Sequence, residues 1–109
     1  MTQPNPVKPP KHLAATTRRW FSDVLESYEL EDHHVRILTL AGESWDRGQQ
    51  ARAVLDRDGL TYMSRFDEPR ARPEVAIERD CRISFARLIR ELGLDTEPPT
   101  QTARPPKRL

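Results

Sequence analysis

The sequence has only one cysteine, Cys81, among 109 residues and therefore cannot close an internal disulfide bond. Its three histidines lack the Cys/His spacing of a zinc site, and its four glycines form no phosphate-binding loop. No run of about 18 apolar residues could span a bilayer, and residues 1–6 lack the apolar stretch of a secretory signal. We therefore expect a soluble, intracellular protein without membrane contact, cofactor or metal.

Acidic residues are missing from both ends of the chain. Residues 1–19 contain four basic residues and no acidic one, whereas residues 20–48 contain seven acidic residues and two arginines. Residues 98–109 again contain three basic residues and no acidic one, and eight of the ten prolines lie in the two ends. Because proline favours extended, solvated backbone, we predict a flexible, basic, proline-rich arm over residues 1–15 and a similar tail over 98–109. The remaining residues, 16–97, are predicted to form a helical body.

Two stretches of the body have the period of an amphipathic helix. Residues 18–28 predict a short helix with an aromatic-rich face, and the threonine that caps its first turn is expected to be Thr16 or Thr17. A second helix is expected to begin near Asp32, a good cap, and to stop before Gly59. Its roughly 26 residues would reach about 40 Å. A helix that exceeds its own core in this way often lies against a neighbour.

The period changes after the second helix. Residues 60–62 and the neighbourhood of 65–66 are predicted as short strands, with turn chemistry at 67–69, which favours a small hairpin or ordered loop. Pro73 suits the first turn of a third helix, which Gly93 is expected to end. The buried face of this helix is predicted to hold Ile77, Cys81, Phe85, Leu88 and Leu92. The predicted fold is mainly α: short helix, long helix, small β-hairpin or loop, C-terminal helix.

Few residues favour catalysis. The triplet Asp32-His33-His34 resembles the signature of metal-dependent phosphoesterases, but those enzymes need further aspartates at the ends of parallel strands, which this chain lacks. A helix cap followed by two solvated residues is the favoured interpretation. Cys81 falls on an apolar stripe, where a free cysteine behaves as a small hydrophobe. We therefore expect a protein that is not an enzyme.

Four aromatic residues and two glycines allow two interpretations each. The aromatic side chains could stack on nucleic-acid bases, but their helical spacing among aliphatic residues favours core packing. They are Trp20, Phe21, Tyr28 and Trp45.

Gly42 and Gly48 lie inside the long helix, where glycine costs about 1 kcal/mol relative to alanine. They mark either a close helix crossing or kink, or simple tolerance of glycine.

The basic ends give the main indication of function. Lysine and arginine on an extended segment can neutralise phosphates and release counterions, which gives salt-dependent binding to nucleic acid. The alternative is a pair of solubilising tails. Charge alone leaves both interpretations open.

Six segments of the body stand in a characteristic order. They are residues 18–21 (RRWF), 28–34 (YELEDHH), 41–47 (AGESWDR), 59–62 (GLTY), 72–80 (RPEVAIERD) and 90–94 (RELGL). In this order, over about residues 16–95, the chain resembles the small subunit of phage DNA-packaging terminases. The resemblance implies a non-enzymatic subunit, in the cytoplasm of the infected bacterial host, that binds double-stranded viral DNA. It also implies delivery of that DNA to the large terminase subunit, which has the ATPase and nuclease activities.

The resemblance further implies a homo-oligomeric ring of helical protomers, with oligomerisation and DNA recognition both in residues 16–97. The long helix would then supply the contact between subunits, through Val35, Leu38, Gly42, Trp45, Gly48 and Val54. DNA contacts, chosen on charge, are predicted at Lys8, Lys11, Arg18, Arg19, Arg65, Arg70, Arg72, Arg104, Lys107 and Arg108. The alternative function is a small helical protein-interaction module or antitoxin-like regulator, whose amphipathic helices dock one partner protein.

Overall fold

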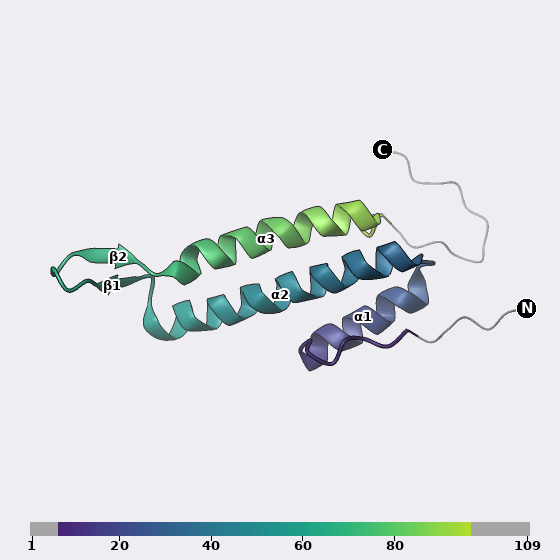
Figure 1. Ribbon diagram of the computed structural model, residues 1–109, viewed down its shortest axis with the longest axis horizontal. Coiled ribbons are helices and arrows are strands. Elements are labelled where there is room, and N and C mark those ends of the chain that lie inside the picture. The colour runs from purple at the N-terminus through teal and green to yellow at the C-terminus, as the bar shows by residue number, and fades with distance from the viewer. Residues whose placement is uncertain (1–6, 97–109) are drawn as a thin grey trace, which may run out of the picture.

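The computed structural model describes residues 7–96, which form three helices and one β-hairpin (Figure 1). The elements are α1 (Ala15–Ser27), α2 (Asp32–Asp58), β1 (Thr61–Met63), β2 (Pro69–Ala71) and α3 (Pro73–Leu92). Figure 1 shows α3 running beside α2 over most of its length, with α1 against the first part of α2 and the hairpin projecting beyond the far end. The predicted mainly helical fold with a small hairpin is confirmed. None of the helices in residues 7–96 is long and apolar enough to cross a membrane.

Helix α1 begins earlier than predicted, and neither threonine caps it. The N-cap is Ala14, whose backbone N–H donates to Asp46 Oδ2 at 2.7 Å. The Thr17 hydroxyl is buried and donates to the other carboxylate oxygen of Asp46. A carboxylate satisfies the unpaired amides and the positive pole of a helix N-terminus. Asp46 on α2 therefore caps the N-terminus of α1, the role that was predicted for Thr16 or Thr17.

The described part of the predicted N-terminal arm is packed against the helices. Leu13 is only 2% exposed, and its N–H donates to Pro10 O at 3.3 Å. The neighbouring His12 lies 2.7 Å from a carboxylate oxygen of Glu43 on α2. Residues 9–14 therefore form part of the body, which begins before residue 16.

Helix α2 is capped by Glu31, one residue before the predicted cap. The Glu31 N–H faces the Nδ1 atom of His34 at 3.3 Å, while Asp32 is the first helical residue. At the other end the chain leaves the helix at Gly59, whose φ of 86° favours glycine. The start and end of α3 at Pro73 and Gly93 are confirmed, and Gly93 takes the left-handed conformation with φ 74°.

The core is concentrated where α1, α2 and residues 9–14 meet. Its buried cluster consists of Leu13, Phe21, Val24 and Leu38. Ala41 and Gly42 on α2 are buried beside this cluster, but between Gly42 and the end of α2 only Ala51 and Leu55 are buried, and among residues 73–92 of α3 none is. The predicted buried face of α3 is therefore at most half-buried, and Ile77, at 39% exposed, is wrong as a buried residue. The reason is that α3 packs mainly on α2 and leaves its other flanks open.

The hairpin differs from its predicted form in the second strand. Thr61 pairs with Ala71, and Met63 pairs with Pro69, in an antiparallel register. The predicted strand at residues 65–66 is wrong, because these residues lie in the connecting turn. Ser64 organises this turn: its Oγ accepts from the backbone N–H groups of residues 66 and 68 at 3.1 and 3.4 Å. Every strand residue is exposed, so the hairpin is a protrusion.

Candidate nucleic-acid interface

The N-terminal cations form the first group of predicted DNA contacts. Lys8, Lys11 and Arg19 are exposed, and none has an acidic partner within 4.0 Å among residues 7–96. Arg18 is half-buried, and its guanidinium donates to the carbonyl oxygens of Leu13 and, at 3.4 Å, Lys11. These bonds hold the turn at Lys11 against the first turns of α1. Lys11 and Arg19 thus belong to one folded unit that Arg18 supports, and the exposed Lys8 lies three residues before Lys11. Lys8, Lys11 and Arg19 are called the basic segment below.

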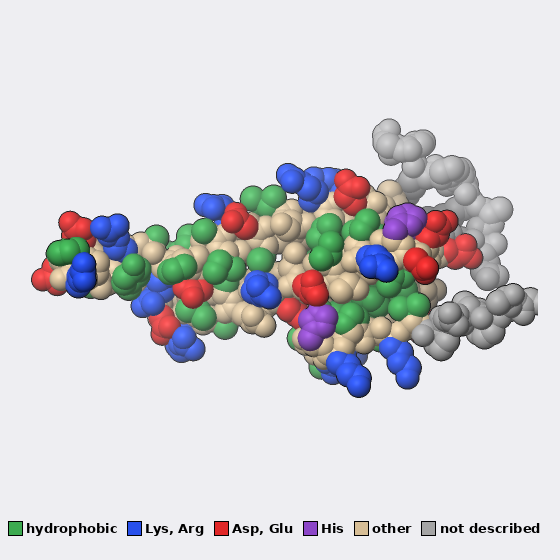
Figure 2. Space-filling view, in the orientation of Figure 1, with side chains coloured by type: hydrophobic (Ala, Val, Ile, Leu, Met, Phe, Trp, Pro, Cys, Tyr) green, Lys and Arg blue, Asp and Glu red, His purple; other side chains and the backbone are tan. Residues whose placement is uncertain are grey.

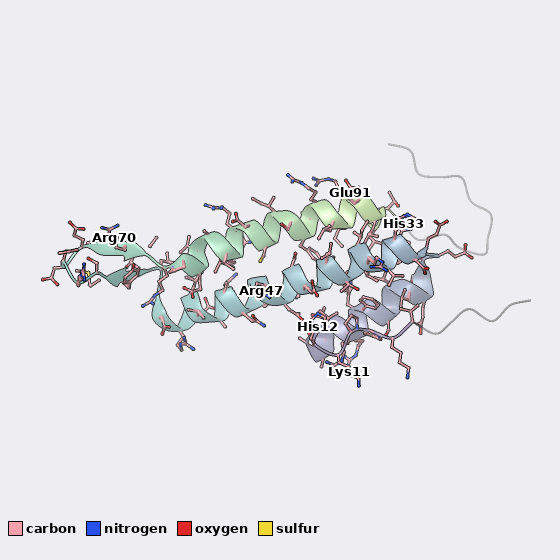
Figure 3. The ribbon with its side chains drawn as sticks, in the orientation of Figure 1. Lys11, His12, His33, Arg47, Arg70 and Glu91 are labelled. Atoms are coloured by element: carbon pink, nitrogen blue, oxygen red, sulfur yellow. The ribbon has the colours of Figure 1, made fainter. Side chains whose placement is uncertain are left out.

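Around α1, positive and negative charges gather on different parts of the surface. Figure 2 shows basic side chains along the outer edge of α1 and acidic side chains at the end where α1 joins α2. In Figure 3, Lys11 lies on that outer edge and His12 lies beside it, toward α2. At this end of the molecule basic and acidic side chains are therefore separated on the folded surface, and the basic segment is exposed to solvent.

The hairpin cations form a second group, distant from the first. Arg65 lies over the Phe66 ring at 5.0 Å from its centroid, and Arg70 is 3.2 Å from Glu68. Arg72 is half-buried, and its Nε has no hydrogen-bond partner in the described part of the chain. The labelled Arg70 and Lys11 lie toward opposite ends of the molecule in Figure 3. A single chain therefore does not bring the predicted contacts together.

The remaining predicted DNA contacts lie outside the described residues. They are Arg104, Lys107 and Arg108.

Arg57, at the hairpin end of α2, is compensated by its neighbour. Its guanidinium donates to the Asp58 carboxylate at 2.8 and 3.0 Å. This hydrogen bond lowers the pKa of Asp58 below its ordinary value and raises the pKa of Arg57. The pair stays charged at neutral pH, so Arg57 adds little net attraction for phosphate.

The predicted oligomer contacts on α2 divide between core and surface. Leu38 is fully buried, and a Cβ on Gly42 would lie 3.1 Å from Leu13 Cδ1 and 3.2 Å from Thr17 Cγ2. Leu38 and Gly42 are thus enclosed by their own chain and are wrong as contacts with another copy. The others are less enclosed: Val35, Gly48 and Val54 are half-buried, and Trp45 is 46% exposed.

Both helical glycines mark close approaches, as one of their two interpretations predicted. Gly42 faces the N-terminal segment, whereas a Cβ on Gly48 would lie 3.1 Å from the Cβ of Cys81 on α3. Cys81 is half-buried at this crossing, in keeping with its predicted packing role. Close packing explains why α2 carries glycine at two interior positions despite their low helix propensity.

The sequence did not reveal the exposed apolar side chains of the hairpin and of the α2–α3 pair. On the helices they are Leu40, Trp45, Ile77 and Ile83, and on the hairpin they are Leu60, Tyr62, Met63 and Phe66. Phe66, at the tip, is 68% exposed. Leu40 lies outside the stripe that the helical period identifies, and three-residue strands give too short a pattern to assign an inner face.

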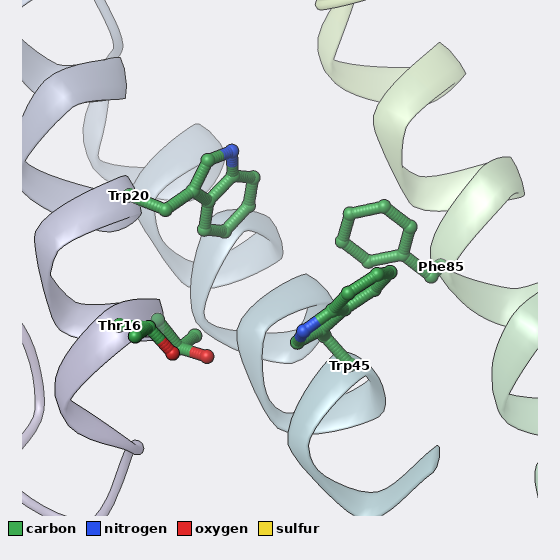
Figure 4. A pocket seen from close by; sticks show the side chains of 5 residues that line it. Thr16, Trp20, Trp45 and Phe85 are labelled. Atoms are coloured by element: carbon green, nitrogen blue, oxygen red, sulfur yellow. The ribbon is translucent and has the colours of Figure 1, made fainter. Parts of the chain in front are cut away.

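An aromatic pocket opens between the three helices (Figure 4). It has a volume of about 430 Å³ and is lined by Thr16, Thr17, Trp20, Trp45 and Phe85. The Phe85 ring centroid is 5.9 Å from that of Trp20 and 5.1 Å from that of Trp45. The core packing predicted for four aromatic residues is confirmed for Phe21, which is fully buried, but is wrong for the half-exposed Trp45.

The triplet Asp32-His33-His34 forms the start of α2. His33 is exposed, with Nδ1 3.8 Å from a Glu31 carboxylate oxygen, and its ring centroid is 4.1 Å from that of His34. Within residues 7–96 no three His, Cys, Asp or Glu side chains converge as a metal site. The triplet lies at the helix start and His33 is solvated, as interpreted, but Asp32 is the first helical residue and not the cap, and His34 is half-buried.

Comparison of the chain with models of protein families, with curated proteins and with solved structures finds no match. Its function is therefore inferred from its own residues.

Proposed function

We propose that this chain is the DNA-recognition subunit of a phage DNA-packaging motor, equivalent to a small terminase subunit. It binds double-stranded viral DNA without catalysis, assembles into a homo-oligomeric ring and delivers the DNA to the large terminase subunit. The observation that carries DNA binding is the basic segment: Lys8, Lys11 and Arg19 are exposed and have no acidic partner among residues 7–96. The resemblance of the sequence to the terminase family supports the assignment to packaging.

Three free cations give modest affinity by themselves. Each phosphate contact adds a salt-dependent, sequence-independent contribution through counterion release. Several copies of the basic segment on one assembly would act together, because linked sites bind with a high effective concentration. DNA recognition by this chain therefore depends on self-association.

The α2–α3 pair supports self-association. No residue of α3 (Pro73–Leu92) is buried within residues 7–96, and Leu40, Ile77 and Ile83 expose 39 to 51% of their surface. At about 25 cal/mol per Å² of apolar area, covering these side chains favours association. A second copy of the pair would supply that cover.

DNA binding is tested by the salt dependence of the affinity for a labelled duplex, measured by fluorescence anisotropy. The triple variant Lys8→Ala/Lys11→Ala/Arg19→Ala should reduce the slope of log K against log salt by about 2.7, which corresponds to three phosphate contacts at roughly 0.9 each. The matched control is Arg36→Ala/Arg47→Ala/Arg87→Ala, which removes the same charge from exposed helix positions. Equal slopes for the two variants would count against the basic segment as the DNA site.

A protein-interaction module remains the second candidate, because the hairpin exposes apolar side chains. Leu60, Met63 and Phe66 are each at least 60% exposed. Exposed apolar clusters are typical of protein contacts.

In the packaging function this surface would face the large subunit, whereas an adaptor or regulator would use it as its main site. The variant Met63→Ser/Phe66→Ser should keep DNA affinity if the packaging proposal holds. A chain that binds no DNA, but loses a partner protein with this variant, would favour the adaptor.

A further inference from the structure

The aromatic pocket is apolar and open to solvent. Trp20, Trp45 and Phe85 line it from three different helices, and Trp45 is 46% exposed (Figure 4). Its volume of about 430 Å³ exceeds the roughly 150 Å³ cavity that holds a benzene molecule. The pocket is therefore large enough for a planar ligand of one or two fused rings.

The rings of the pocket suit stacking with a nucleic-acid base. The Phe85 ring is inclined by 54° to that of Trp45 and by 48° to that of Trp20, so the three rings do not stack face to face on one another. An accessible indole can stack on any base, because every base has a π-face. The Thr16 side chain lines the same pocket and adds a hydroxyl that can bind a base edge. For Trp45, stacking on a base therefore explains the exposed ring that core packing does not.

A second hollow extends the pocket toward the basic segment. It has a volume of about 560 Å³, shares Trp45 and two threonines with the aromatic pocket, and reaches His12. His12 follows Lys11, which lies on the outer edge of α1 in Figure 3. The exposed side-chain amides of Gln49 and Gln50 also line this hollow and can bond to a base or a sugar. One continuous surface thus leads from the three rings to the neighbourhood of a cation.

Charge complementarity indicates a nucleic-acid strand as the occupant. Arg19 precedes Trp20 on α1, about 100° around the helix. Arg19 and Lys11 are exposed, and neither has an acidic partner within 4.0 Å among residues 7–96. A ligand that places a planar ring beside these two cations gains most if it also carries negative charge. A nucleotide combines a stacking base with a phosphate.

Acidic residues near the pocket set the direction of the strand. Glu43 and Asp46 are engaged, the first by His12 at 2.7 Å and the second by the start of α1. The exposed Asp23 lies one helical turn beyond the pocket, toward the acidic end of α1 in Figure 2. Like charges repel phosphate on that side. The strand should therefore leave the pocket toward the basic segment.

We propose that the Trp20–Trp45–Phe85 pocket binds one unpaired base of a DNA strand whose phosphates contact Arg19 and Lys11. This inference rests on the proposed DNA-binding function and names a further ligand class for it, DNA with a single-stranded end or gap. A base inside a duplex reaches the pocket only by leaving its stack, which is unfavourable. A blunt duplex is thus held through phosphates alone, and a single strand through phosphates and one base.

Two probes of equal charge separate the base from the phosphates. One is an oligothymidylate of about ten nucleotides, and the other is an abasic deoxyribose-phosphate chain of the same length. The sequence has two tryptophans and both line the pocket, so quenching of tryptophan fluorescence reports a bound base directly. We expect the oligothymidylate to quench this fluorescence and to bind about tenfold more tightly than the abasic chain, through the stacking of one base.

Variants locate the preference for a base. Trp45→Ala should bring the two affinities within about twofold, because the indole face is lost, and Trp45→Phe should restore part of the preference. The matched control Leu40→Ala removes a similarly exposed apolar side chain from α2 and should keep the tenfold preference. Lys8→Ala/Lys11→Ala/Arg19→Ala should weaken the binding of both probes and leave the ratio of their affinities unchanged.

The outcomes distinguish this inference from the function on which it rests. Equal affinity of the unmodified chain for the two probes would overturn the inference, and a duplex that still binds through the basic segment would leave the DNA-binding function intact. A preference that persists in Trp45→Ala would place the base elsewhere and would overturn it as well. A chain that binds neither the probes nor the duplex would contradict both.

Discussion

The two ends of the long helix α2 have contrasting surroundings. Near its start, α2 contacts α1 and the N-terminal segment, and Leu13, Phe21 and Leu38 are buried almost completely. Past the part of α2 that α1 covers, only α3 lies beside α2 within residues 7–96, and the hairpin projects with every strand residue exposed. We call these the closed end and the open end. The difference teaches that one amphipathic helix can complete a core where a third layer exists and leave apolar side chains exposed where it does not.

The strongest contrast concerns two phenylalanines. Phe21→Ala at the closed end should lower the free energy of unfolding by about 3–5 kcal/mol, through lost burial and the cavity left behind. Phe66→Ala at the open end should change it by less than about 0.5 kcal/mol, because that ring is exposed. Urea denaturation followed by circular dichroism measures both. Similar losses for the two variants would mean that the hairpin is packed and that the contrast is wrong.

The two helical glycines give a second contrast. In Gly42→Ala the new methyl group meets Leu13 and Thr17 inside the closed core, and we expect a net destabilisation of about 1–2 kcal/mol. In Gly48→Ala it meets only Cys81, on a helix with no buried residue among 73–92, and the gain in helix propensity of about 1 kcal/mol offsets the crowding. The midpoint temperature of thermal unfolding should therefore shift in opposite directions for the two variants, or fall by clearly more in Gly42→Ala.

The cap supplied by Asp46 is a third test of the closed end. Asp46→Ala removes the acceptor for the Ala14 amide and the Thr17 hydroxyl, and the expected loss is about 0.5–2 kcal/mol. The exposed Asp56, whose ion pair with Arg52 is at the surface, provides the control Asp56→Ala with a loss near zero. An equal loss at both positions would contradict the tertiary cap.

The smallest expected change in folding stability comes from the open end. Ile83→Ser alters a half-exposed side chain and should change the unfolding free energy of an isolated chain by less than about 0.5 kcal/mol. It should instead weaken self-association, which sedimentation velocity measures. Unchanged sedimentation would show that Ile83 lies outside the contact between copies.

Proline and glycine residues at the ends of helices made most of the fold predictable. Pro73 and Gly93 fix the ends of α3 through their own backbone preferences, so no tertiary information was needed. The cap of α1 was missed because it comes from Asp46, about thirty residues farther along the chain. The second strand was missed because it begins at Pro69, a residue that indicates a turn when only its neighbours are considered.

The surfaces were harder to predict than the helices. Helical period shows that Leu38 belongs to an apolar face, but it does not show whether that face meets α1 or another copy. Trp45 shares the same stripe and is half-exposed, because α1 ends its contact with α2 close by. The charge of the basic segment was evident from the sequence. Its support by Arg18 required the folded chain, because the carbonyl groups that Arg18 binds carry no side-chain signal.

Native mass measurement of the purified full chain, with and without a DNA duplex, tests the central claim most directly. The claim is that the exposed apolar face of the α2–α3 pair associates with other copies and that the basic segment of each copy then contacts phosphate. We predict one discrete multimer that gains the mass of a bound duplex and releases it as salt is raised. A monomer that binds no duplex at low salt would contradict this account.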